Sequence, residues 1–312
     1  MNAKKLIVIA GPTAVGKTAV AIRVATALDT DIISADSRQI YREMSIGTAK
    51  PTAAERAARR HYFVDTHSVE EDYDAAAYTE EALAVIGELF TRHDELVLCG
   101  GSGLYIKGVC EGFDEMPEVP TGIRQHLIER YKQYGIEWLQ DQMRTLDPQT
   151  LESIDARNPH RLIRALEVRL ASGKSILSFR SNRKQARDFD IVKVGLELPR
   201  EELYSRIDER MDRMIADGLF EEAHGLYPMR HHNALQTVGY QEIFDFIDNR
   251  YDLNECVRLL KRNSRRYAKR QLTWFKKDPE YTWFNPLEID TILSHIRKSI
   301  NRTEDLKSDF RH

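Results

Sequence analysis

One loop near the amino terminus constrains the fold of this chain more than any other feature. The sequence GPTAVGKT at 11–18 matches the pattern G-x-x-x-x-G-K-[ST]. It follows the apolar run LIVIA at 6–10, which predicts a buried strand, and it precedes a helical pattern at 18–28. Because the motif requires this strand–loop–helix context, we expect a phosphate-binding loop at the edge of a parallel sheet. The residues expected to hold a diphosphate or a nucleotide are Gly11, Pro12, Thr13, Ala14, Val15, Gly16, Lys17 and Thr18.

The residue types in this loop suit a phosphate anion. Gly11 and Gly16 permit backbone conformations that turn successive N–H groups toward one point, and the following helix adds the partial positive charge of its N-terminus. Lys17 supplies a full charge for the terminal phosphoryl oxygens, and the Thr18 hydroxyl suits a Mg²⁺ ligand. We therefore expect Mg²⁺ as the counter-ion of a bound diphosphate.

The position of the acidic residues favours a diphosphate leaving group over hydrolysis of a nucleotide. Nucleotide hydrolases usually carry Asp or Glu after a later apolar strand, where it holds Mg²⁺ and sets up the attacking water. The apolar run ELVLCGG at 95–101 ends in glycines and is followed by Ser102. A carboxylate follows the predicted strand DIISAD at 31–36 instead. Asp36 is therefore a candidate general base, with helix capping and Mg²⁺ binding as alternative roles.

Alternating strand and helix patterns predict an α/β fold. Strands at 6–10, 31–36 and 95–101 alternate with helical patterns at 18–28 and 73–92, which is typical of a parallel sheet flanked by helices. Ligands of such sheets bind at the carboxyl ends of the strands. The phosphate loop and Asp36 both lie at such ends.

The pattern changes after the proline-containing segment EMPEVP at 115–120. From 123 to about 187 the pattern is helical, and a strand returns at 190–198. The helices expected beyond this point span 123–134, 138–146, 159–172, 200–217, 219–226, 240–249 and 254–275. The expected domains are a P-loop core at 1–120 and 190–290, an all-α insertion at 121–189, and a polar C-terminal tail at 291–312 that frays.

Composition and charge exclude several classes of protein. With 42% hydrophobic and 30% charged residues and a net charge of −3, the chain has the balance of an ordinary globular protein and no global field for nucleic acid. No run approaches the roughly 18 apolar residues of a membrane span. Cys99, Cys110 and Cys256 follow no pairing pattern, so we expect reduced, buried thiols. We expect a cytoplasmic monomer without a membrane partner.

Further motifs resemble one enzyme family. After GPTAVGKT come ADSRQIYREMSIGTAKP at 35–51, GGSGLYIKG at 100–108, NPHRLIRALE at 158–167, LQTVGYQE at 235–242 and KRNSRRYAKRQLTWFKKDP at 261–279. In this order they resemble the tRNA dimethylallyltransferase family, from Leu6 to about Phe284. The resemblance implies transfer of a dimethylallyl group from dimethylallyl diphosphate to N6 of the adenosine directly 3′ of the anticodon. The implied partners are dimethylallyl diphosphate and the anticodon stem-loop of tRNAs that read codons beginning with U.

The chemistry of the residues, considered without the resemblance, also suits this reaction. An exocyclic adenine amine is a weak nucleophile, so the donor must ionise readily, as an allylic diphosphate does. Catalysis then requires stabilisation of the leaving anion and a base near N6, which Lys17 and Asp36 can supply. The resemblance implies that Arg210 binds the same diphosphate. Arg206 is the second choice, and an exposed helix face with i,i+4 ion pairs is the alternative for both arginines.

The resemblance also implies which residues meet the RNA. Ser102 stands where the family often has Thr, near the target adenosine, and His160 stands where it often has Gln. Tyr240 can stack on an unstacked base or pack in the core. The implied RNA-binding residues are Asp36, Ser37, Arg38, Gln39, Ser102, Arg124, His160, Arg161, Leu162, Ile163, Arg164, Gln236, Thr237, Val238, Gly239, Tyr240 and Gln241.

A basic segment at 261–277 contains no acidic residue. At helical spacing it forms two adjacent columns, Lys261/Arg265/Lys269 and Arg262/Arg266/Arg270, beside a more buried side marked by Leu260, Tyr267, Gln271 and Trp274. A charged run is usually a solvated face, but solvated helices interleave both signs. We therefore expect Lys269 and Arg270 to contact tRNA.

Three other functions are compatible with parts of this pattern. A nucleotide or small-molecule kinase shares the P-loop and the parallel sheet, but it does not account for the basic segment or for the missing carboxylate after 95–101. A nucleotide-gated RNA-binding protein does not account for Asp36 and the ordered motifs. An isopentenyltransferase acting on free AMP has little use for a helical insertion with its own basic face.

Overall fold

The computed structural model describes residues 4–181 and 183–308, with side chains up to Asn301. The chain divides into two compact units. The first joins the residues up to Cys110 with those from Ala186 onward, and the second is Glu111–Gln185. The second unit begins before the expected 121 because the extended segment after α4 (Gly103–Glu111), which contains Pro117 and Pro120, belongs to it.

The first unit is built on a parallel sheet, so the predicted α/β fold is confirmed. Among the described residues the sheet has six strands in the order β3-β2-β4-β1-β5-β6, and every pairing is parallel. Two strands, β3 and β6, were not expected, because two or three residues are too few for an alternating pattern. The strands are β1 (Lys5–Ala10), β2 (Ile32–Ser34), β3 (His61–Tyr62), β4 (Glu95–Gly100), β5 (Asp190–Leu196) and β6 (Thr282–Phe284).

Side chains of β1 alternate between two hydrophobic cores. Leu6 and Val8 belong to a core shared with α3, α4 and α9–α11, whereas Ile7 and Ile9 belong to one shared with α1, α8 and α12. Because successive strand residues point to opposite faces, a strand covered on both faces is apolar throughout. The helices of this unit are α1 (Lys17–Ala27), α2 (Ala53–Ala58), α3 (Ala75–Leu89), α4 (Gly103–Glu111), α8 (Arg200–Ala216), α9 (Leu219–Leu226), α10 (Gln241–Ile247), α11 (Leu253–Phe275) and α12 (Ile289–Ser308).

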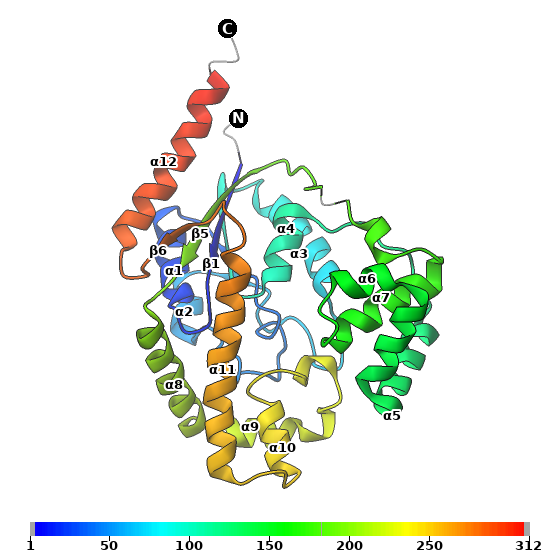
Figure 1. Ribbon diagram of the computed structural model, residues 1–312. Helices are drawn as coiled ribbons and strands as arrows, with labels where there is room; N and C mark the ends of the chain where they lie inside the picture. The colour runs from blue at the N-terminus through cyan, green and yellow to red at the C-terminus, as the bar shows by residue number, and fades with distance from the viewer. Residues whose placement is uncertain (1–3, 182, 309–312) are drawn as a thin grey trace. The chain divides into compact units, whose positions relative to one another are not determined.

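The expected polar tail at 291–312 is helical up to Ser308 in the structure. The helix α12 packs against α1 and β5 (Figure 1). Ile292 and Ile296 are four residues apart, so they lie on the same side of this helix, and both are fully buried. This apolar stripe holds an otherwise polar helix on the sheet. Residues 309–312 lie outside the described part of the chain.

The second unit is helical in its described residues, as expected, and has its own core. It contains α5 (Thr121–Leu146), α6 (Pro148–Ser153) and α7 (Pro159–Ser172). Two helices were expected where α5 stands, and Gly135, with φ of 76°, breaks the helix between them. Leu139, Met143, Leu162 and Leu166 are fully buried in this core.

Two smaller expectations can be compared with the structure. Cys99, Cys110 and Cys256 are all buried, as predicted. Across residues 4–181 and 183–308, no helix is both long and apolar enough to cross a membrane.

Candidate active site

The phosphate loop connects β1 to α1 as its sequence predicts. Gly16 has φ of 105° and Ala14 has φ of 65°, so the chain turns sharply before α1 begins at Lys17. The Lys17 ammonium donates a hydrogen bond of 2.8 Å to the Pro12 carbonyl. Burial lowers the pKa of Lys17 to about 8, although Cys99 and Asp36 oppose the shift. The loop therefore holds a weakly hydrated ammonium that gains from any anion bound beside it.

Arg210 reaches this loop from α8. Its Nη2 donates to the Thr13 hydroxyl at 2.5 Å, and burial lowers its pKa while Asp36 opposes the shift. Arg206, the second choice, pairs with Glu202 at 2.9 Å in an i,i+4 ion pair. The alternative of an exposed, ion-paired face thus describes Arg206, whereas the structure brings Arg210 to the predicted phosphate site.

Gln271 was assigned no role from the sequence, yet it ties the site together. This buried α11 side chain accepts a hydrogen bond from the Thr13 amide at 2.8 Å and donates to the Gly101 carbonyl at 2.9 Å. One amide thereby fixes the phosphate loop against the loop after β4. The contact joins residues 258 positions apart, which no local pattern reveals.

Asp36 lies beyond the carboxyl end of β2, beside the phosphate loop. One of its oxygens, Oδ1, accepts backbone hydrogen bonds from Arg38 at 2.9 Å and Gln39 at 3.3 Å. In the described part of the chain the other oxygen has no hydrogen-bond partner. These bonds stabilise a turn rather than cap a helix, because the described residues directly after Asp36 begin no helix, and they use one oxygen only. Asp36 lines a cavity of about 450 Å³ together with Thr13, Lys17, Thr18 and Arg210, which we call the phosphate cavity.

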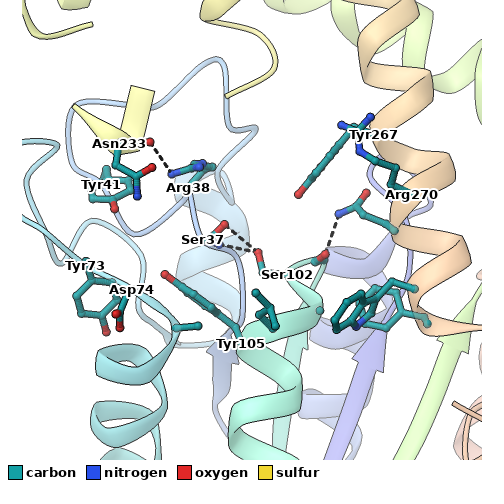
Figure 2. A pocket seen from close by; sticks show the side chains of 17 residues that line it. Ser37, Arg38, Tyr41, Tyr73, Asp74, Ser102, Tyr105, Asn233, Tyr267 and Arg270 are labelled. Atoms are coloured by element: carbon teal, nitrogen blue, oxygen red, sulfur yellow. Dashed lines mark hydrogen bonds between the residues drawn. The ribbon is translucent and has the colours of Figure 1, made fainter. Parts of the chain in front are cut away.

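Two serines join the loops after β2 and β4. The Ser102 hydroxyl accepts a hydrogen bond from the Ser37 amide at 2.8 Å and donates to the Ser37 hydroxyl at 3.1 Å (Figure 2). The Gln39 side chain, by contrast, donates to the carbonyls of Thr48 and Ala49 at 3.2 and 3.1 Å. Ser37 and Ser102 are thus brought together, whereas the Gln39 amide is held within its own loop.

A second cavity of about 450 Å³, the aromatic cavity, opens beside these serines. Tyr73 and Tyr105 lie on one side of it, and Tyr267 and Arg270, both from α11, lie on the other (Figure 2). A small third cavity of about 70 Å³ adjoins both. It shares Thr13, Asp36, Thr48 and Arg210 with the phosphate cavity and Arg38 and Tyr267 with the aromatic cavity. Asp36 therefore stands where the two larger cavities approach each other.

The expectation that Tyr240 stacks on an RNA base is wrong, and its alternative of core packing is found. Tyr240 is fully buried, and its hydroxyl donates to Glu222 at 2.6 Å. The Glu222 carboxylate also accepts the backbone N–H groups of residues 45, 46 and 47 at 2.8–3.0 Å. Gln236 and Gln241 are exposed and bonded to each other at 2.7 Å. Thr237, Val238 and Gly239 line the small third cavity.

The implied RNA-binding residues of the second unit divide into two groups. Leu162 and Ile163 are buried in the core of that unit, so their side chains cannot meet RNA. His160 and Arg161 are exposed. Arg124 and Arg164 share one buried partner, Glu167, at 3.0 and 3.3 Å. This carboxylate orients the two guanidinium groups and was not expected from the sequence.

In the folded protein, acidic residues of α8 pair with the basic segment of α11. Lys261 pairs with Asp212 at 2.6 Å and Arg265 pairs with Asp208 at 2.5 Å, both from α8. Lys269 and Arg270 are exposed and have no ion pair with any described residue. Trp274, expected on the more buried side, is 41% exposed. Two cations of the segment are therefore neutralised by α8, and the expected contact of Lys269 and Arg270 with tRNA stays a prediction.

Comparison with known proteins identifies the family. A family model described as IPP transferase matches residues 39–278. The tRNA dimethylallyltransferase of Cytophaga hutchinsonii is 49% identical over 95% of this chain and 98% of that protein. The tRNA dimethylallyltransferase 1 of Bacteroides fragilis is 44% identical over 96% and 100% of the two chains.

Solved structures agree with this assignment. The full-length tRNA isopentenylpyrophosphate transferase of Bacillus halodurans, 36% identical, superposes with a TM-score of 0.74 over 98% of this chain and 99% of that one. A eukaryotic dimethylallyltransferase acting on tRNA, 23% identical, has the same fold, with a TM-score of 0.76 over 98% and 80% of the two chains. The chain belongs to the IPP transferase family.

Proposed function

We propose that this protein transfers a dimethylallyl group from dimethylallyl diphosphate to N6 of the adenosine directly 3′ of the anticodon in tRNA. The relatives named above support this reaction class. The observation that carries the proposal is the position of Asp36, which lines both the phosphate cavity and the small cavity that adjoins the aromatic cavity. A carboxylate there stands between a donor held by the phosphate loop and an acceptor base that enters from the opposite side.

The phosphate cavity suits the leaving group. Lys17, Arg210 and the Thr13 hydroxyl surround one point, and two of these groups are cations. In the reaction the C1–O bond of the donor breaks as the N6–C1 bond forms, and the electron pair leaves with the diphosphate. Negative charge thus develops where Lys17 and Arg210 lie, so these groups stabilise the transition state more than the ground state.

The proton released from N6 requires an acceptor. The Asp36 oxygen Oδ1 is fixed by the backbone of Arg38 and Gln39. These bonds hold the carboxylate in place while the other oxygen accepts the N6 proton, as a general base does. Ser37 and Ser102, bonded to each other beside Asp36, supply hydroxyl groups for the edge of the adenine ring.

Mg²⁺ fits the oxygen donors of the phosphate cavity. Thr18 and Ser34 line it, and Mg²⁺ prefers oxygen ligands and phosphate oxygens. The Thr18 hydroxyl makes no hydrogen bond to the described residues, which leaves it available. When bound, the ion supplies charge neutralisation for the departing diphosphate.

The test measures transfer of labelled dimethylallyl from its diphosphate to unmodified tRNA, with ATP hydrolysis assayed on the same preparation. We expect label on tRNAs with adenosine directly 3′ of the anticodon and no ATP turnover. An Asp36→Asn variant should bind tRNA normally and lose at least about 100-fold in turnover. ATP turnover without label transfer would instead indicate a kinase, and full turnover by Asp36→Asn would exclude Asp36 as the base.

A further inference from the structure

The aromatic cavity is larger than one target base requires. Its volume of about 450 Å³ lies within the range of roughly 300–1,000 Å³ found for pockets that bury whole drug-sized ligands. A purine ring alone is smaller than such ligands. The proposed reaction also needs the adenine close to Asp36, at the end of the cavity where Ser37 and Ser102 lie. The rest of the cavity, toward Leu104 and Trp274, is left without an occupant.

That remaining part exposes two large apolar side chains. Leu104 is 52% exposed and Trp274 is 41% exposed, and both line the cavity. An exposed tryptophan beside a cavity is unusual for a surface that stays in water, because its indole is a large apolar group. The indole is also fixed on one side. A Cβ atom added at Gly103 would lie only 2.2 Å from the Trp274 Nε1 atom, so the absence of a side chain at Gly103 allows this close approach.

The charge around the cavity identifies the occupant. Arg38 and Arg270 line it, and among the described residues neither forms an ion pair with a carboxylate. The one acidic side chain of the lining, Asp74, already accepts the N-terminal amides of α3 from Ala76 and Ala77 at 2.8 and 3.0 Å. Aromatic rings beside arginines that have no carboxylate partner are the combination that binds single-stranded nucleic acid, since the rings stack on bases and the cations attract phosphates.

We propose that the aromatic cavity receives a second nucleobase of the RNA, unstacked beside the target adenine, and that Trp274 is the platform on which this base stacks. The inference rests on the proposed function, since it takes the target adenine to lie at Asp36. It assigns to Trp274 a role in RNA affinity and none in donor binding. The phosphate cavity does not include Trp274 in its lining.

Steady-state kinetics with an unmodified anticodon stem-loop separate these roles. Replacement Trp274→Ala should raise KM for the stem-loop by about tenfold, the effect of losing one base–aromatic stack, and leave KM for dimethylallyl diphosphate unchanged. Trp274→Phe should retain most of the affinity because a ring remains. The matched control is Leu253→Ala, which removes an equally exposed apolar side chain at the first residue of the same helix. It should leave both KM values unchanged.

Two further measurements address the stacked base itself. The stem-loop should quench tryptophan fluorescence in the wild type and much less in Trp274→Phe, where Trp138 and Trp283 remain. In the wild type, a stem-loop with an abasic nucleotide on one side of the target should bind about tenfold more weakly than the intact stem-loop. In Trp274→Ala the abasic and intact stem-loops should bind equally, because the stacking partner is already lost. Unchanged RNA KM in Trp274→Ala, with an active wild type, would overturn the inference. An inactive wild type would count against the proposed function instead.

Discussion

The two ends of the cationic stretch of α11 carry similar charges but have different surroundings. At the paired end, where α11 packs against α8, Lys261 and Arg265 form ion pairs with Asp212 and Asp208 (Figure 1). Further along the helix, Lys269 and Arg270 are exposed and unpaired within the described residues. Lys261 and Arg265 hold a neighbouring helix, whereas Lys269 and Arg270 have no carboxylate partner among the described residues.

Under the proposed function, this difference assigns the two substrates to different ends of one helix. Lys261 and Arg265, at the paired end, hold α8, and α8 brings Arg210 to Thr13 in the phosphate loop. The unpaired end borders the aromatic cavity through Arg270. A run of cations in the sequence therefore contains residues of both kinds, and only the neighbouring helix distinguishes them. Variants that change only one of these groups of residues can therefore separate donor binding from RNA binding.

The largest effect is expected at the diphosphate. Replacement Arg210→Ala removes a guanidinium aimed at the leaving group, so kcat/KM for dimethylallyl diphosphate should fall by roughly 100- to 1,000-fold. Binding of tRNA, measured by filter retention, should not change. Arg206→Ala, on the same helix but paired with Glu202, is the control and should stay within about twofold. A similar loss in both variants would mean that the helix, rather than the guanidinium, matters.

The pH dependence of kcat/KM for the donor should report the charge of Lys17 in the phosphate loop. Burial lowers the pKa of Lys17 to about 8, so the free enzyme loses this charge as the pH rises through that value. We expect kcat/KM for the donor to fall about tenfold per pH unit above about 8, because neutral Lys17 no longer attracts the diphosphate. Binding of tRNA should show no such step. Lys17→Arg stays protonated, so a decline of the same size in that variant would assign it to another group.

The strand–loop–helix conformation around Lys17 could be predicted from the sequence, because that information is local. A strand, a glycine loop and a helix N-terminus follow one another along the chain, so GPTAVGKT specifies Lys17 and its surroundings without knowledge of the fold. The alternation of strands and helices was sufficient for the sheet, since β1 is apolar on both faces. The family resemblance added Arg210, which the charge pattern of α8 alone could not separate from Arg206.

The missed features all depend on contacts between distant segments. Gln271 meets Thr13 across 258 positions, and the acids that neutralise Lys261 and Arg265 come from a different helix. The ring of Tyr240 could stack on a base, but its hydroxyl is bonded to Glu222, which also accepts backbone N–H groups from residues 45–47. A pattern within one segment reports the amphipathicity of that segment and nothing about the segment that covers it.

A smaller effect is expected at the unpaired end of α11. The double replacement Lys269→Ala and Arg270→Ala should weaken tRNA binding by about tenfold near physiological salt. It should also flatten the slope of log K against log salt by roughly one unit or more, because each of the two lost phosphate contacts removes roughly 0.7. Donor KM should not change. A binding titration over a range of salt concentrations measures both quantities. An unchanged slope would show that these cations do not contact phosphate.

The smallest effect on tRNA binding is expected when Lys261 and Arg265, at the paired end, are replaced. Replacement of Lys261 and Arg265 by Ala also removes two cations, so any difference from the preceding variant reflects position rather than net charge. Their ion pairs are partly exposed, and such pairs contribute about 0.2–1 kcal/mol each. We expect Tm to fall by a few degrees at low salt and less at high salt. The slope of tRNA binding against salt should match the wild type. A slope as flat as that of the Lys269 and Arg270 variant would mean that both ends of the cationic stretch meet RNA, and that the acids of α8 do not keep Lys261 and Arg265 from phosphate.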